Sequence, residues 1–146
     1  MQRASSDGRS TRGDAREPLR ILVVDDDENL RFMLRLLFDD PSVEDIHDAA
    51  NGEEALAIAE RERPNVIVCD CRMPVMSGDE AGRRLRITLP DALIVSYSGL
   101  DADKPWADEA IIKASGDDID RLRDTVLGHG LRAAPLESLE IRPPKP

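Results

Sequence analysis

The sequence has few cysteines, few aromatic side chains and no long apolar run. Cys69 and Cys71 are the only cysteines, and their separation by one residue places them poorly for a disulfide within a strand. No apolar run approaches the about 18–20 residues that a membrane span needs, and the amino-terminal arginines are not followed by an apolar stretch. We therefore expect neither a secreted nor an integral membrane protein, and predict a cytoplasmic protein with reduced thiols.

Positive charge is also scarce relative to negative charge. Twenty Lys and Arg stand against thirty Asp and Glu, which gives a formal net charge of −10. Such a charge opposes binding to nucleic acid or to an anionic membrane, so we expect no direct contact with either. The length of 146 residues, 40 % of them hydrophobic, suits one domain with a single core.

Apolar periodicity is confined to the middle of the chain. We predict a disordered tail over residues 1–18, a folded domain over 19–130 and a flexible tail over 131–146 that contains four prolines. Within the domain, short Val- and Ile-rich runs alternate with segments of helical spacing. The predicted strands are Leu19–Val24, Val43–Ala49, Asn65–Cys69, Leu93–Ser98 and Ala110–Ile112. This alternation predicts an α/β fold, a doubly wound parallel sheet covered by helices on both faces.

The connection between the fourth and fifth predicted strands is short. Only eleven residues separate Ser98 from Ala110, and Pro105 interrupts them. A crossover needs about 10–12 residues in all, so we expect the helix in this connection to be reduced to a turn or two. Trp106, the only tryptophan, lies in this segment. The favoured interpretation is that its ring fills the space left by the helix, and the alternative is an anchor for a partner.

Acidic residues follow two of the predicted strands. The first strand runs into Asp25, Asp26, Asp27 and Glu28, and the third runs into Asp70. In a parallel sheet the carboxyl ends of the strands share one edge, which is where ligands bind in such folds. Clustered carboxylates repel one another unless a hard cation such as Mg²⁺ accepts their oxygens as ligands. The alternative for the first acidic run is a capped helix start.

The fourth and fifth strands end in residues of complementary chemistry. Ser98 and Gly99 end the fourth strand, and Lys113 follows the fifth. A metal and a lysine neutralise phosphoryl oxygens, a hydroxyl donates a hydrogen bond, and a carboxylate can be the nucleophile. The order of these residues along the chain therefore indicates phosphoryl transfer.

With these residues at the ends of its predicted strands, the sequence resembles the receiver domain of two-component response regulators, over about residues 19–130. The signatures that carry the resemblance are Ile21–Asp26, Ala50–Leu56, Val66–Pro74 with Gly78, Tyr97–Gly99, and Lys113. The resemblance implies a flavodoxin-like sheet of five parallel strands in the order 2-1-3-4-5. It implies that Asp70 is the phosphoacceptor and that Asp25, Asp26, Asp70 and the carbonyl of Arg72 bind Mg²⁺. It further implies that Ser98 binds the phosphoryl group and that Lys113 pairs with it.

The resemblance also implies the partners and the mode of action. We expect a stand-alone receiver that accepts a phosphoryl group from a histidine kinase or a histidine phosphotransfer protein and contacts a downstream protein. It would not be an enzyme beyond catalysing its own phosphorylation and dephosphorylation. Two positions depart from the family pattern, since Ala110 replaces an aromatic residue and Ala114 a proline.

Two alternatives remain open at this stage. One is a receiver-like module that binds partners without being phosphorylated. The other, of a different class, is a magnesium-dependent phosphatase with an aspartate nucleophile. Phosphatases of the haloacid-dehalogenase type have an Asp-x-Asp motif at the first strand, whereas the acceptor here follows the third.

Overall fold

Five strands and four helices make up the described part of the chain, and they alternate except that the fifth strand follows the fourth with no helix among the described residues between them. The computed structural model describes residues 17–73, 75–99, 104–113 and 116–130. The strands are β1 (Leu19–Val24), β2 (Val43–Ala49), β3 (Val66–Cys69), β4 (Leu93–Ser98) and β5 (Glu109–Ile112). The helices are α1 (Glu28–Leu37), α2 (Gly52–Glu62), α3 (Gly78–Thr88) and α4 (Asp118–Leu127). Within the described part of the chain, none of these helices has the length and apolar character needed to cross a membrane.

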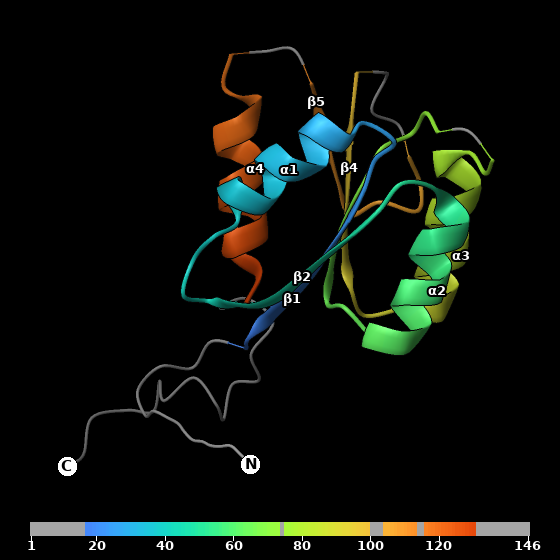
Figure 1. Ribbon diagram of the computed structural model, residues 1–146, viewed down its shortest axis with the longest axis horizontal. Helices are drawn as coiled ribbons and strands as arrows, with labels where there is room; N and C mark the ends of the chain where they lie inside the picture. The colour runs from blue at the N-terminus through green and yellow to red at the C-terminus, as the bar shows by residue number, and fades with distance from the viewer. Residues whose placement is uncertain (1–16, 74, 100–103, 114–115, 131–146) are drawn as a thin grey trace.

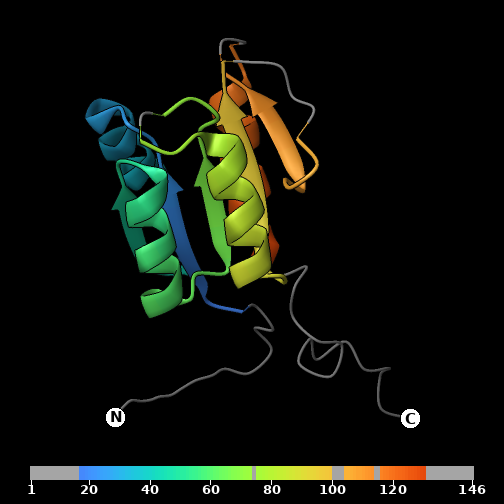
Figure 2. The ribbon, with the colours of Figure 1, turned by 90° about the vertical axis from the view of Figure 1, so that its right-hand side faces the viewer.

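The strands form one sheet in the order β2-β1-β3-β4-β5, and every neighbouring pair is parallel. Helices α1 and α4 cover one face and α2 and α3 the other, as Figure 1 shows. Figure 2, turned by 90°, shows α2 and α3 side by side in front of the sheet. The predicted doubly wound fold and its strand order are thereby confirmed.

The strand bounds differ from the predicted ones in two places. β3 begins at Val66 rather than Asn65, and β5 begins at Glu109 rather than Ala110. Asn65 is nevertheless bonded to the neighbouring strand β1. Its side chain accepts a hydrogen bond from the Arg20 amide, and its own amide donates to the Arg20 carbonyl. Glu17, which we assigned to the amino-terminal tail, donates its amide to the Gly130 carbonyl and so joins the folded part. Pro18, also assigned to that tail, accepts a hydrogen bond from the Asn65 side chain through its carbonyl, while residues 1–16 and 131–146 lie outside the described residues.

Two apolar layers hold the helices to the sheet, one on each face. On one face, Leu34 of α1 and Phe38, the residue that ends this helix, pack with Leu122 and Val126 of α4. On the other face, the buried side chains of α2 and α3 are small apart from Leu85, which lets these helices lie close to the strands. The helical spacing in the sequence predicts an apolar face for α1 made of Leu30, Met33, Leu34, Leu37 and Phe38. All of these except Met33, which is exposed, pack in the layer shared with α4.

Trp106 occupies the place of a fourth crossover helix. Residues 104–108 form a turn rather than a helix, and 100–103 lie outside the described residues. The Trp106 ring is only 4 % exposed and covers Gly82, where a Cβ atom would lie 2.2 Å from a ring carbon. Its indole N–H donates to Asp79 Oδ1 at 3.0 Å, and its carbonyl accepts two hydrogen bonds from Arg86. The space-filling interpretation is confirmed, because a ring buried this deeply is not available to anchor a partner.

Candidate functional site at the carboxyl edge of the sheet

Four parallel strands end at the same edge of the sheet and bring the predicted residues together there. Asp25 follows β1, Asp70 follows β3, Ser98 ends β4 and Lys113 follows β5. The Asp70 amide donates to the Val24 carbonyl, and the Lys113 amide donates to the Ser98 carbonyl. These ladder bonds extend past the strand ends, so the backbone that carries the four side chains is fixed by the sheet.

Three carboxylates meet at this edge. Ligand oxygens of Asp25, Asp26 and Asp70 lie within 4.8 Å of one another. Asp25 and Asp70 are buried, and Asp26 is exposed. Burial raises the pKa of Asp25 above its ordinary value, although a hydrogen bond from the Asp27 amide and the charge of Lys113 act in the opposite direction. Three hard oxygen donors in this arrangement fit a divalent cation such as Mg²⁺.

Lys113 is the cation that the structure itself supplies to this cluster. Its Nζ atom lies 3.0 Å from Asp25 Oδ2 and 3.7 Å from Asp70 Oδ2. The same ammonium lies 5.4 Å from the centre of the Tyr97 ring. Among the described residues, Lys113 is the only ion-pair partner of these three carboxylates, so the cluster keeps excess negative charge, which a bound cation would offset.

A cavity of about 270 Å³ opens beside Asp70. Arg72, Ser98, Gly99 and Lys113 complete its lining. The Arg72 amide donates to Asp70 Oδ1 at 3.2 Å, while its side chain is exposed. The structure therefore brings together every side chain that the sequence predicted for the site, and the arrangement can hold an anionic group between an ammonium, a hydroxyl and a guanidinium.

The acidic run after β1 divides between a helix cap and the carboxylate cluster. Asp27 is the N-cap of α1, and its side chain accepts from the amides of Asn29 and Leu30. Asp25 and Asp26 take no part in that cap and belong to the carboxylate cluster. Different members of one acidic run thus cap the helix and form the site.

Gly78 fixes the loop that follows Asp70. Its amide donates to the Cys71 carbonyl, and a Cβ atom at this position would lie 2.1 Å from the Asp70 carbonyl oxygen. The sequence motif included this glycine, but only the folded chain shows that the backbone of Asp70 and Cys71 lies against it. Val75 in the same loop adopts a positive φ of 73°, which is strained for a β-branched residue.

Sequence reasoning missed a buried hydrogen bond behind the site. The Tyr97 hydroxyl donates to Asp118 Oδ2 at 2.5 Å, and both side chains are buried. Burial and the Asp118 carboxylate raise the pKa of Tyr97, so it stays a neutral donor. The bond ties β4 to the first turn of α4. In the sequence, Tyr97 was visible only as a neighbour of Ser98, and Asp118 only as a member of an acidic helix start.

Replacing Tyr97 with Phe is expected to lower the free energy of unfolding by about 1–3 kcal/mol, because the buried Asp118 carboxylate loses its short donor. Urea unfolding measures this change. Asp118→Asn is the matched control, since its amide oxygen can still accept from the tyrosine, and it should cost less. Equal stability of wild type and Tyr97→Phe would show that the bond contributes nothing.

The two cysteines do not form a chemical site. Both are free thiols and both are buried. Burial raises the pKa of Cys69, which keeps it protonated, and Cys71 Sγ lies 3.2 Å from the Ser96 hydroxyl. They are core side chains of the β3 end.

Comparison with known proteins identifies a family. Residues 21–119, more than half of the chain, match the response regulator receiver domain. A protein-glutamate methylesterase/protein-glutamine glutaminase from Hahella chejuensis is 42 % identical over 85 residues, which are 56 % of this chain and 24 % of that protein. The response regulator MprA from Mycolicibacterium vanbaalenii is 38 % identical over 113 residues, covering 65 % of this chain and 48 % of MprA. The chain thus spans about a quarter to a half of the length of these relatives.

Solved structures of response regulators share the fold of this chain. The response regulator TrrA from Thermotoga maritima, in complex with Mg²⁺ and BeF, shares 31 % identity at a TM-score of 0.64, over 75 % of this chain and 98 % of TrrA. The chemotaxis protein CheY4 from Vibrio cholerae shares 25 % identity at the same TM-score, over 75 % of this chain and 99 % of CheY4. Residues 21–119 match the family, and the strand order and the carboxylate cluster agree with that match. This chain therefore belongs to the response regulator receiver domain family.

Proposed function

We propose that Asp70 accepts a phosphoryl group from a phosphohistidine of a kinase or of a histidine phosphotransfer protein. The observation that carries this proposal is the cavity in which Asp70 faces Lys113 and Ser98 beside the acidic pair Asp25 and Asp26. A carboxylate there is accessible to a donor, yet sits next to groups that offset the charge of the transferred phosphoryl oxygens.

The transfer needs one bond to form and one to break. An oxygen of the Asp70 carboxylate forms the new bond to phosphorus, and the bond between phosphorus and the donor imidazole nitrogen breaks. Lys113 would neutralise a phosphoryl oxygen, and Ser98 would donate its hydroxyl hydrogen to another. The backbone contacts at Arg72 and Gly78 hold the Asp70 segment in place, so that the carboxylate is positioned before the donor arrives.

The carboxylates of Asp25, Asp26 and Asp70 would hold Mg²⁺, with the Arg72 carbonyl as a further proposed ligand. When bound, the ion supplies positive charge against the phosphoryl oxygens. The solved relative TrrA was crystallised with Mg²⁺ and BeF, which supports a magnesium site in this family.

Incubation with acetyl phosphate and Mg²⁺, followed by intact-mass spectrometry, tests the proposal. A receiver should retain one phosphoryl group per chain. A partner-binding module that is not phosphorylated would gain none, and a phosphatase with an aspartate nucleophile would release inorganic phosphate with turnover and retain no stoichiometric label. Either of these results would overturn the proposal.

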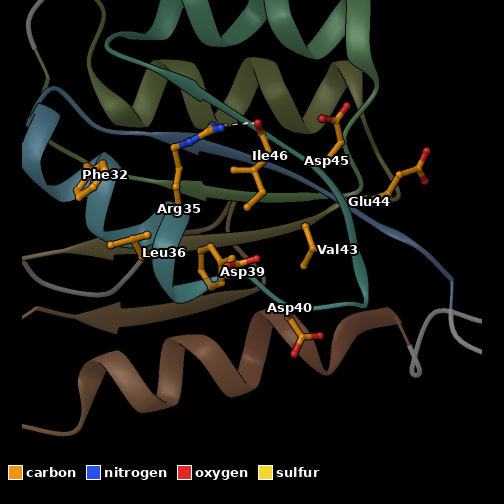
Figure 3. Close-up of a pocket in the computed structure, with 10 residues that line it drawn as sticks. Phe32, Arg35, Leu36, Asp39, Asp40, Val43, Glu44, Asp45 and Ile46 are labelled. Carbon is orange, nitrogen blue, oxygen red and sulfur yellow. Dashed lines mark hydrogen bonds between the residues drawn. The ribbon is translucent and has the colours of Figure 1, made fainter.

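The output would be contact with other proteins, and α1 offers an apolar surface for the donor. Phe32 and Leu36 of α1 are 64 % and 60 % exposed, and the helix begins directly after the acidic cluster. Figure 3 shows both side chains on α1, and they line a pocket together with Asp39, Asp40 and residues 43–46. A phosphodonor that reaches Asp70 has to cover surface near the start of α1.

The double variant Phe32→Ser/Leu36→Ser is expected to slow phosphotransfer from a donor kinase by at least about tenfold, because each buried apolar contact at an interface contributes about 1 kcal/mol or more. Labelling by acetyl phosphate should stay unchanged. Radiolabel transfer from a kinase selected by a phosphotransfer profile measures the effect. Ile87→Ser on α3, where the side chain is 80 % exposed, is the matched control. Equal slowing by that control would contradict a specific role of α1.

A further inference from the structure

A second cluster of metal-ligating side chains lies away from the phosphorylation site. It consists of Asp45 and His47 of β2 and Glu62, the last residue of α2. Asp45 and His47 are two residues apart on the strand, so their side chains point to the same face of the sheet, the face that α2 covers. Figure 3 shows Asp45 directed to the opposite side of β2 from Leu36. One ligand atom from each of the three residues lies within 4.8 Å of the other two, and none of these residues belongs to the acidic cluster.

The distances within this cluster match a coordination shell. His47 Nε2 lies 3.1 Å from Asp45 Oδ2 and 3.5 Å from Glu62 Oε1. Zinc bonds to nitrogen and oxygen of about 2.0–2.1 Å place tetrahedral ligands about 3.3 Å apart. The two distances bracket that value, and the shorter one is also that of a hydrogen bond between His47 and Asp45. A single imidazole nitrogen therefore faces two carboxylate oxygens at the spacing that one shared cation would impose.

A neighbouring residue orients one of the ligands. Arg61 Nε lies 2.9 Å from Glu62 Oε2, which leaves the other carboxylate oxygen directed to His47. Hydrogen bonds to the non-ligating atoms of a metal ligand fix its orientation and add to metal affinity. The side chains of His47, Glu62 and Asp45 are 28 %, 32 % and 48 % exposed, so packing partly orders the first two and the cluster is open to an ion from solvent.

The chemistry of the donor set selects the class of ion. Two carboxylates and one neutral imidazole carry a charge of −2, which suits a divalent cation. Imidazole is a common ligand of Zn²⁺ and of the other late first-row ions, whereas Mg²⁺ takes oxygen ligands and keeps most of its waters. We propose that Asp45, His47 and Glu62 form a binding site for a zinc-type divalent cation, which links β2 to the end of α2 and leaves at least one position for water.

Isothermal titration with Zn²⁺, in millimolar Mg²⁺ that occupies the acidic cluster, tests this proposal on the full chain. Wild type should bind one Zn²⁺ per chain at this site. His47→Asn and Glu62→Gln should each weaken binding by at least about tenfold, since even outer contacts of a metal site are worth about 10–100-fold.

His129→Asn is the matched control, because His47 and His129 are the only two histidines of the chain. It should bind Zn²⁺ as wild type does. Circular dichroism of each variant checks that it is folded, and the ring nitrogen signals of His47 in an NMR spectrum should shift on addition of Zn²⁺. Unchanged affinity in His47→Asn, no binding by wild type, or loss of binding in Asp26→Ala in place of His47→Asn would each overturn the proposal.

Discussion

The variant Asp70→Asn is expected to lose phosphoryl incorporation by at least about 10³-fold, the scale of effect seen when a nucleophile is removed. The amide keeps the shape of the carboxylate and its acceptor oxygen, so the hydrogen bond from the Arg72 amide can persist and the fold should be retained. What it lacks is a competent nucleophilic oxygen. Intact-mass spectrometry after incubation with acetyl phosphate and Mg²⁺ measures the result.

Asp91→Asn serves as the control for this experiment, because Asp91 is an exposed acid outside the site. It should label as wild type does. If Asp70→Asn carried as much phosphate as wild type, Asp70 would not be the sole acceptor, and the assignment of the cavity beside it would fail. Circular dichroism distinguishes loss of chemistry from loss of fold.

Millimolar Mg²⁺ is expected to raise the melting temperature of the protein, by on the order of 5 °C when the ion is at about ten times its dissociation constant. The physical reason is repulsion among Asp25, Asp26 and Asp70 in the ion-free protein. Only the folded state brings these carboxylates together, so a cation that binds them stabilises that state by mass action. Thermal unfolding with and without Mg²⁺ measures the shift.

The pH dependence of this effect follows from Asp25. Its pKa is raised in the folded state, chiefly by burial, so the folded protein binds a proton there more tightly than the unfolded chain does. The destabilisation by ionised Asp25 is therefore fully present above the raised pKa. It is relieved as the pH falls through that pKa toward the ordinary value of 3.8. Because Mg²⁺ competes with that proton, the stabilisation by Mg²⁺ should shrink over the same range.

Two variants separate the metal site from general charge effects. Asp26→Ala should remove most of the Mg²⁺-dependent shift at little cost to the fold, because Asp26 is exposed. Asp91→Ala, which removes an exposed acid elsewhere, should leave the shift as in wild type. A melting temperature that does not respond to Mg²⁺ in wild type would contradict the proposed magnesium site.

Local sequence signals were enough to predict the fold and which residues meet at the candidate site. The residues of the candidate site end or directly follow the apolar runs of the sequence, so the sequence alone places each of them at the end of a strand. Because parallel strands end at one edge, placing Asp25, Asp70, Ser98 and Lys113 on their strands was enough to predict that they meet. The Asp27 cap was equally predictable, since it depends on residues two and three positions further along. The roles of these residues in phosphoryl transfer and metal binding stay predictions.

Only the tertiary structure decided contacts between residues far apart in the chain. The sequence could not show that Tyr97 would find Asp118, or that Glu62 would reach His47 from the end of a helix. It also gave no reason for Met33 to be exposed, because helical spacing does not define where the apolar face of a helix ends. Such pairings depend on the rotation of each helix against the sheet and on which side chains fill the space between them. That packing is settled by the whole core at once, and short sequence patterns carry no information about it.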